Sequence, residues 1–284
     1  MLKYLRDLLA NIPLPFLQNP APVVAILPLE GVIGSSGRLS KPLNLAAIED
    51  RITRAFDIYN LKAVALAVNS PGGSPVQSEL IMRRIKDIAK EKKIPVYAFA
   101  EDVAASGGYL ISLAAEEIYA HEASIVGSIG VISAGFGFNR AIDKIGVDRR
   151  VYAAGDSKSI LDPFQPEKDK DVKLLKDMQK EIHEFFKNLV KESRGDKLKG
   201  AQKTLFSGQF WAGKDAVKLG LVDGIGDLHT VCREKFGPKT KFKRIREDKP
   251  FLKSLLGISL VRPKISDEIL ATLESRALWS RFGL

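Results

Sequence analysis

Cysteine and histidine are scarce in this sequence, which has one cysteine and three histidines among 284 residues. The single cysteine, Cys232, cannot form a disulfide within the chain. No group of cysteines and histidines has the spacing of a zinc site, so we expect neither a metal nor another cofactor. Any catalysis must then come from other side chains.

A long uncharged apolar run is also missing. The first 17 residues contain leucines at helical spacing, but Asp7, Pro13 and Pro15 interrupt them. They predict neither a transmembrane helix nor a signal peptide, and we expect a cytoplasmic protein. The leucine face suits a short helix docked on protein, and peripheral contact with the inner face of a membrane stays open as an alternative.

Acidic residues are too few to balance the basic ones. The 44 lysines and arginines exceed the 34 aspartates and glutamates, which gives a formal net charge of +10. Much of the excess lies late in the chain, between Arg233 and Lys253. Such a run is usually a solvated surface, which argues against nucleic-acid binding and leaves contact with an anionic membrane open.

Apolar runs and helical patterns alternate after a proline-rich linker. Strands are predicted at residues 23–29, 63–68 and 95–100, with helices at 45–59 and 76–92 between them. Strands that alternate with helices form right-handed crossovers and a parallel sheet, so we expect an α/β fold.

The later part of the chain shows a less regular alternation of strands and helices. We expect a short strand at residues 150–153, a long charged helix at 166–191, a helix within 206–226 and a terminal helix at 266–279. The predicted domains are an N-terminal segment (1–22), the main domain (23–236) and a basic C-terminal extension (237–284).

Two glycine-rich loops follow neighbouring strands of the predicted sheet. Working loops leave the carboxyl ends of parallel strands, so residues 69–73 and 102–108 should meet there. Ser106 is the candidate nucleophile, at the start of a predicted helix. The amides of Gly73 and Gly107 are the candidate oxyanion donors. Each loop alone would also fit ordinary helix capping and turn formation.

The general base is less obvious. His121 is the best histidine for a conventional triad, but it lies only fifteen residues after Ser106 at the start of a loop, and we expect a structural role. His183 and His229 fall in polar surroundings that favour the surface. Lys158 lies in a loop with small residues, where a lysine can act as a base only if burial lowers its pKa.

Five ordered blocks resemble the signal peptide peptidase A and SohB family of bacterial serine/lysine proteases. They are residues 68–73 (VNSPGG), 104–109 (AASGGY), 127–131 (GSIGV), Gly155 with Lys158, and 206–208 (FSG) leading to 219–223 (LGLVD). The resemblance covers about residues 23–226.

The resemblance implies a role for each matching residue. Ser106 falls on the family's nucleophile, Lys158 on its general base, and Gly73 and Gly107 on its oxyanion donors. The hydroxyl that orients the lysine amine falls on Ser128. The implied fold is crotonase-like and related to the Clp protease, with parallel sheet layers flanked by helices and a ring of protomers whose sites lie near subunit boundaries.

The function implied is a serine endopeptidase that hydrolyses cleaved signal peptides or other unfolded apolar polypeptides. One alternative is a crotonase-type acyl-CoA hydratase or isomerase, which shares the fold and the paired amides but usually needs carboxylates. A second alternative is a non-catalytic ring scaffold at membranes. The joint presence of Ser106 and Lys158 argues against the scaffold.

Overall fold

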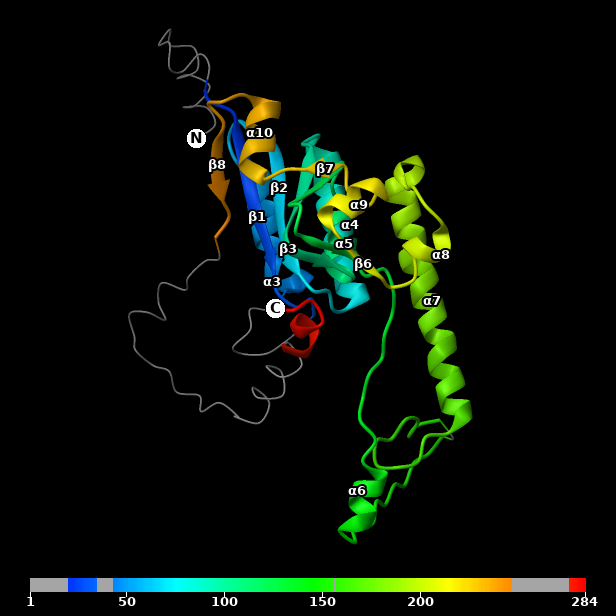
Figure 1. The fold of residues 1–284 in the computed structure, drawn as a ribbon. Helices are drawn as coiled ribbons and strands as arrows, with labels where there is room; N and C mark the ends of the chain where they lie inside the picture. Colours follow the sequence, from blue (N-terminus) through cyan, green and yellow to red (C-terminus); the bar gives the residue numbers. More distant parts are fainter. Residues whose placement is uncertain (1–19, 35–42, 156, 247–275) are drawn as a thin grey trace, which may run out of the picture.

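A computed structural model describes residues 20–34, 43–155, 157–246 and 276–284. The helix suggested near the N-terminus and most of the terminal helix expected at 266–279 lie outside these ranges. The described residues form one mainly parallel sheet flanked by helices (Figure 1). None of the helices in these ranges is long and apolar enough to cross a membrane.

The sheet has the strand order β6-β5-β3-β2-β1-β8, and β4 pairs with both β3 and β7. Every pairing is parallel except that between β5 and β6. The strands are β1 (Val23–Glu30), β2 (Leu61–Ser70), β3 (Val96–Ala105), β4 (Glu117–Ala120), β5 (Ile125–Gly127), β6 (Phe210–Ala212), β7 (Gly224–Ile225) and β8 (Lys241–Arg244).

Helices connect most of these strands. They are α3 (Leu45–Phe56), α4 (Pro75–Lys92), α5 (Gly107–Ser112), α6 (Asn139–Lys144), α7 (Asp169–Arg194), α8 (Gln202–Leu205), α9 (Gly213–Lys218) and α10 (Leu228–Phe236), with a 3-10 turn, η1 (Gly195–Lys197), after α7. A last helical turn at residues 276–280 lies near the C-terminus.

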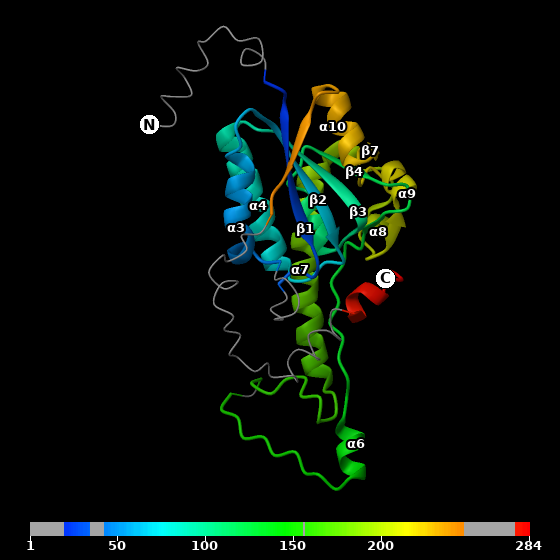
Figure 2. The ribbon, with the colours of Figure 1, turned by 90° about the vertical axis from the view of Figure 1, so that its left-hand side faces the viewer.

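The central strands are buried on both faces, as expected for a parallel sheet between helices. Helices α3 and α4 cover one face, and α10 lies on the other (Figures 1 and 2). Leu27, Leu66 and Ile81 belong to the larger core between the sheet and α3 and α4. On the α10 side, Tyr97 and Cys232 belong to a smaller cluster.

Local sequence signals fix where the two outer helices begin. The Asn44 side chain accepts a hydrogen bond from the Ala47 amide and caps α3. Ser74 caps α4 in the same way, and Pro75 at the first helical position suits a helix start. The cap of α4 therefore places its first turn directly after the 69–73 loop.

A long excursion leaves the sheet after β5. Residues 131–168, which we call the arm, extend past the N-terminal end of α7 and carry α6 near their tip (Figures 1 and 2). None of the arm's described residues is buried. Phe138 packs on both Phe136 and Phe164 within the arm. Tyr152 is 92% exposed, so the arm presents apolar side chains to its surroundings.

Three expectations need correction. Residues 150–153 form no strand. Residues 206–226 are divided among β6, α9 and β7 instead of forming one helix, because β6 pairs with β5 and Gly213 sits against the His121 carbonyl. Residues 241–244 pair with β1, so the sheet continues beyond the expected domain end at residue 236.

Candidate active site

Ser106 occupies a strained turn between β3 and α5. Its φ of 52° and ψ of −119° lie in a region that non-glycine residues rarely adopt. Such strain costs on the order of 1–3 kcal/mol and is concentrated at functional sites. Although Ser106 stands at the N-cap position, its side chain makes no capping hydrogen bond. The Ser106 hydroxyl therefore does not act as an ordinary helix cap, which was the alternative interpretation of this loop.

The loop after β2 lies directly against this turn, as predicted from the sheet. Ser70 pairs with Ala104 across β2 and β3. A side chain at Gly72 would place its Cβ 2.7 Å from the Ser106 Cβ. At Gly73 an added Cβ would lie 2.1 Å from the Ile33 carbonyl oxygen. Glycine is required at both positions, since their φ angles of 109° and 143° also disfavour other residues.

Two backbone amides stand beside Ser106. An added Cβ on Gly107 would lie 3.4 Å from the Gly73 nitrogen, which places the two glycines next to each other. Neither amide donates to any acceptor within the described part of the chain, whereas the adjacent Ser74 amide donates to Ile33. A pair of free, adjacent amides can stabilise the oxyanion that forms when a carbonyl is attacked.

Ser128 lies on the other side of the nucleophile turn. The Ser106 amide donates to the Gly127 carbonyl at 2.7 Å, and the Ser128 amide donates to the Gln209 carbonyl at 2.8 Å. Ser128 is buried and has a φ of 53°. Four of the five predicted site residues, namely Ser106, Gly73, Gly107 and Ser128, are thus brought together by one end of the sheet.

A cavity of about 420 Å³ opens at Ser106. Helix α7 forms one wall with apolar side chains that recur every three or four residues, among them Leu175, Met178 and Ile182. The opposite lining comes from Gly73, Gly107 and neighbouring loops. None of the described lining residues is an aspartate or glutamate. The cavity suits an extended apolar ligand next to a serine and two amides.

Lys158 is not brought to Ser106 within one chain. It is exposed and lies in a turn of the arm, where its amide donates to the Gly155 carbonyl. It is absent from the residues that line the Ser106 cavity. The expected dyad is therefore split between the sheet and the arm.

The histidines do not supply a base in its place. His121 lies outside the cavity lining, and its Nδ1 accepts a hydrogen bond from the Ala123 amide in a local turn. His229 packs against Phe242. His183 is half-buried, contrary to its expected surface position, and its Nε2 lies 3.2 Å from the Ile129 carbonyl oxygen, beside Ser128.

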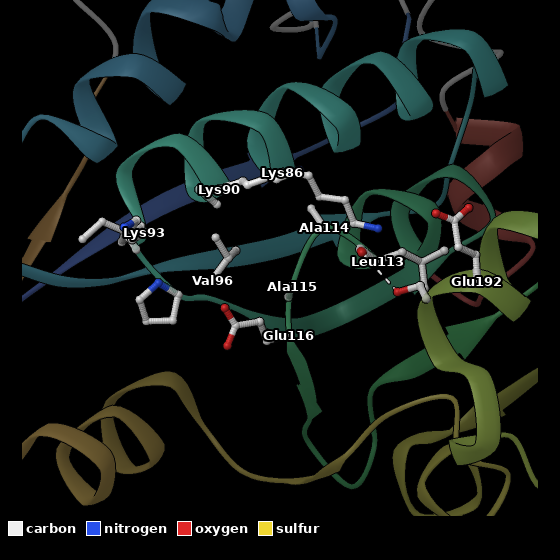
Figure 3. A pocket seen from close by; sticks show the side chains of 13 residues that line it. Lys86, Lys90, Lys93, Val96, Leu113, Ala114, Ala115, Glu116 and Glu192 are labelled. Atoms are coloured by element: carbon white, nitrogen blue, oxygen red, sulfur yellow. Dashed lines mark hydrogen bonds between the residues drawn. The ribbon is translucent and has the colours of Figure 1, made fainter.

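A second cavity of about 590 Å³ lies at the opposite end of β3, where Val96 begins the strand. Figure 3 shows Lys86, Lys90 and Lys93 near the end of α4, with Glu116 below them and Glu192 to the right of Lys86. Burial lowers the pKa of Lys86 and nearby Glu192 opposes this shift. The Ser193 hydroxyl donates to the Leu113 carbonyl. This cavity is lined by charged side chains, but among its described lining residues it holds no serine or cysteine with a free hydroxyl or thiol. It is therefore not a second candidate for the active site.

A buried ion pair anchors the helices that frame the site. Arg194, at the end of α7, is buried and donates to Asp223 at 2.7 Å and to the Gly220 carbonyl. Burial raises the pKa of Asp223, but hydrogen bonds from Arg194, Lys197 and the Ile118 amide outweigh it and leave the pKa below its ordinary value. The pair fixes α7 against the segment that leads into β7.

The comparisons with known proteins agree with this geometry. The family model described as peptidase family S49 matches residues 88–236, slightly more than half of the chain. The chain belongs to peptidase family S49. The matched range includes Ser106, Ser128 and Lys158, and it begins after the 69–73 loop. The predicted relationship to the signal peptide peptidase A family is confirmed.

Two curated relatives of this S49 chain are much longer proteins, and the chain matches only part of each. It is 47% identical over 272 residues, 92% of its length, to the Brucella abortus protein named Na(+)/H(+) antiporter NhaA. It is 32% identical over 213 residues, 72% of its length, to the Arabidopsis thaliana protein named serine protease SPPA, chloroplastic. The matches cover 37% and 31% of those proteins. Because the Brucella abortus protein is much longer than this chain, its name does not show that this chain transports ions.

Solved structures confirm the fold. Two structures of the 1510-N membrane-bound stomatin-specific protease match with TM-scores of 0.52 and 0.50 at 15% identity. They cover 81% and 84% of this chain, and 100% and 97% of their own. One is a serine-to-alanine variant, and the other is a lysine-to-alanine variant in complex with a substrate peptide. At this identity the likeness establishes the Clp-like α/β fold predicted from the sequence.

Sequence reasoning missed much of the cavity wall. The apolar residues of α7 recur at helical spacing, a signal that could have marked a functional face of the long charged helix. Leu278 and Arg281 also line the cavity, although they lie some 170 residues after Ser106 in the chain. Nothing in the local sequence around these two residues indicates that placement.

Proposed function

We propose that this S49 chain is a serine endopeptidase in which Ser106 is the nucleophile and Lys158 the general base. The observation that carries the proposal is the strained Ser106 turn, with its uncapped hydroxyl beside the unpartnered amides of Gly73 and Gly107. A carbonyl carbon placed at the hydroxyl would put its oxygen within reach of those amides. Acyl transfer is the chemistry that uses all of these groups.

The lysine comes from a neighbouring copy of the chain. Lys158 is exposed on the arm and does not line the cavity that holds Ser106. The arm also exposes Phe136 and Tyr152, which a subunit contact would cover. Such a contact would remove water from the lysine amine and favour its neutral form, which is the form that can accept a proton. Assembly would therefore complete the site.

The reaction then follows from the geometry. Ser106 Oγ attacks the carbonyl carbon of a peptide bond while its proton moves to the neutral amine of Lys158. The Gly73 and Gly107 amides donate to the oxyanion, and the Ser128 hydroxyl orients the amine. The C–N bond breaks as the lysine ammonium protonates the leaving amine. A water molecule, deprotonated by the same lysine, hydrolyses the acyl ester and frees Ser106.

The substrates we propose are cleaved signal peptides or other unfolded apolar polypeptides. Leu175, Met178 and Ile182 give the cavity an apolar wall that an extended apolar segment can occupy. A structural neighbour has been captured with a substrate peptide, which agrees with a peptide ligand. The hydratase or isomerase alternative gains no support, because no described lining residue is a carboxylate.

The proposal is tested by labelling the purified protein with a fluorophosphonate, which reacts with activated serine hydroxyls. We expect covalent labelling of Ser106 in the wild type and none in Ser106→Ala, which should keep the wild-type melting temperature because only one hydroxyl is lost from a half-buried position. Ser207→Ala is a matched control, since the Ser207 hydroxyl donates to the Thr204 carbonyl and Ser207 does not line the cavity. Equal labelling of wild type and Ser106→Ala would disprove the assignment.

A further inference from the structure

The last residues of the chain form part of the candidate active site. Figure 1 shows the C-terminal helical turn beside the end of the sheet that carries α5 and β6. Phe282 is buried in a cluster with Val103 and Ala105, the residues that lead into the nucleophile turn. Its ring also meets the Phe210 ring edge-on at a centroid distance of 5.2 Å. This packing fixes the neighbouring Arg281 at the Ser106 cavity.

Arg281 gives the cavity its charge. Every other described residue that lines the cavity is uncharged. The guanidinium lies over the ring of Phe282, 5.9 Å from its centroid, and no carboxylate in the described ranges forms an ion pair with it. The side chain is exposed, so an incoming peptide can reach it. A single cation thus stands in an otherwise uncharged site.

We propose that Arg281 is a specificity-determining residue that selects peptides with a carboxylate close to the bond held at Ser106. This inference rests on the proposed function, because it takes the Ser106 cavity to be a peptide site. The carboxylate can belong to an acidic side chain or to the free C-terminus of a peptide. A guanidinium offers paired N–H donors that match the two oxygens of a carboxylate, which an apolar wall alone cannot recognise.

The expected size of the preference follows from the exposure of the arginine. Ion pairs at solvent-exposed positions are worth up to about 1 kcal/mol, which corresponds to about fivefold in affinity. We take the upper end of that range as the largest preference expected. Because the charge remains open to solvent, added salt should weaken the preference.

The experiment measures binding to Ser106→Ala protein, so that no peptide is cut. The probes are fluorescein-labelled apolar nonapeptides with a single glutamate moved along the sequence, each paired with the same peptide carrying glutamine. A further pair without glutamate compares a free C-terminal carboxylate with a C-terminal amide. Fluorescence anisotropy at low and high salt gives each dissociation constant. The two series distinguish side-chain from C-terminal carboxylates.

Variants made in the Ser106→Ala background assign the preference to one side chain. Arg281→Gln should bring the affinities of each pair together, whereas Arg281→Glu should make the glutamine peptide of each pair bind more tightly than the glutamate peptide. Arg276→Gln is the matched control, because Arg276 is exposed at the start of the helical turn that precedes Arg281 and does not line the cavity. It should keep the wild-type preference of about fivefold.

The outcomes separate this inference from the proposed function. A carboxylate preference that Arg281→Gln removes and Arg276→Gln retains supports the inference, whether or not the wild type cuts the peptides. Equal binding within every pair, or a preference that survives Arg281→Gln, overturns it. Failure of the wild type to hydrolyse or to be labelled at Ser106 counts against the proposed function alone, since the binding measurements use protein without the nucleophile.

Discussion

At the scale of single residues, the site depends on where side chains are missing as much as on where they are present. Gly72 and Gly73 leave room for the Ser106 turn and the Ile33 backbone. Ser106 itself holds a backbone conformation that a relaxed loop would avoid. The meeting of Ser106 with Gly73 and Gly107 could be predicted, because parallel strands bring their carboxyl ends to one edge. The position of Arg281 could not, because it depends on how Phe282 packs at the far end of the chain.

The proposed base makes a prediction at the same scale. Lys158→Arg should lower kcat/KM for an apolar peptide by about 10²- to 10⁴-fold, because arginine keeps the charge but cannot accept the proton. Steady-state kinetics of the variant and the wild type measures the effect.

His121→Ala is the control for that prediction, because a conventional triad would place the proton transfer on this histidine. The His121 side chain accepts a hydrogen bond only within its own turn among the described residues, so the variant should retain nearly full activity. An inactive His121→Ala together with a nearly wild-type Lys158→Arg would show that the serine/lysine mechanism is wrong.

At the scale of elements, the ion pair between Arg194 and Asp223 holds the C-terminal end of α7, while the apolar face of the same helix lines the cavity at Ser106. Long, strongly patterned elements such as α4 and α7 were predictable from periodicity. The segment 206–226 was not, since β6 exists only by pairing with β5, which its own sequence does not reveal. A three-residue strand is set by its tertiary partner, and local propensity carries little information about it.

The ion pair between Arg194 and Asp223 predicts that the stability of the fold depends on pH. The pKa of Asp223 is lower in the folded protein than in the unfolded chain. The pair therefore stabilises the fold fully above the unfolded-state pKa of about 3.9, and this stabilisation is lost as the pH falls through the folded-state pKa. Asp223→Asn should reduce the free energy of unfolding by about 3 kcal/mol at pH 7, because it leaves Arg194 buried without its partner. The difference from wild type should shrink below about pH 4.

Urea unfolding at a fixed protein concentration measures this effect across pH. Asp215→Asn is a suitable control, because Asp215 pairs with Lys218 on the exposed surface of α9 and should contribute under about 1 kcal/mol. Similar losses in the two variants, or a loss in Asp223→Asn that does not depend on pH, would contradict this role for the pair.

At the scale of the whole molecule, the position of the arm has no evident role in a single chain. It carries Lys158 away from Ser106 and exposes aromatic side chains that would gain from a subunit contact. The sequence indicated that a lysine and a serine belong together, but it could not show that the fold separates them. That separation follows from the excursion of residues 131–168 past α7 (Figure 2).

Assembly is therefore expected in solution. Multi-angle light scattering should give a mass several times the 31.2 kDa of one chain under conditions in which the protein hydrolyses peptides. Replacing exposed apolar residues of the arm, as in Phe136→Ser with Tyr152→Ser, should lower both the mass and the activity. A fully active monomer would contradict the shared site.

The most direct test of the account mixes two inactive variants, Ser106→Ala and Lys158→Ala, by co-expression in equal amounts. If the proposed dyad forms between copies, each active site of a mixed assembly should draw its serine from one copy and its lysine from the next. About a quarter of the sites should then hold both groups, and peptide hydrolysis should recover to about that fraction of the wild-type rate. A double variant mixed with Ser106→Ala supplies no intact serine and should stay inactive. Recovery in the first mixture is the predicted result, and no recovery despite proven mixed assemblies would contradict a dyad formed between copies.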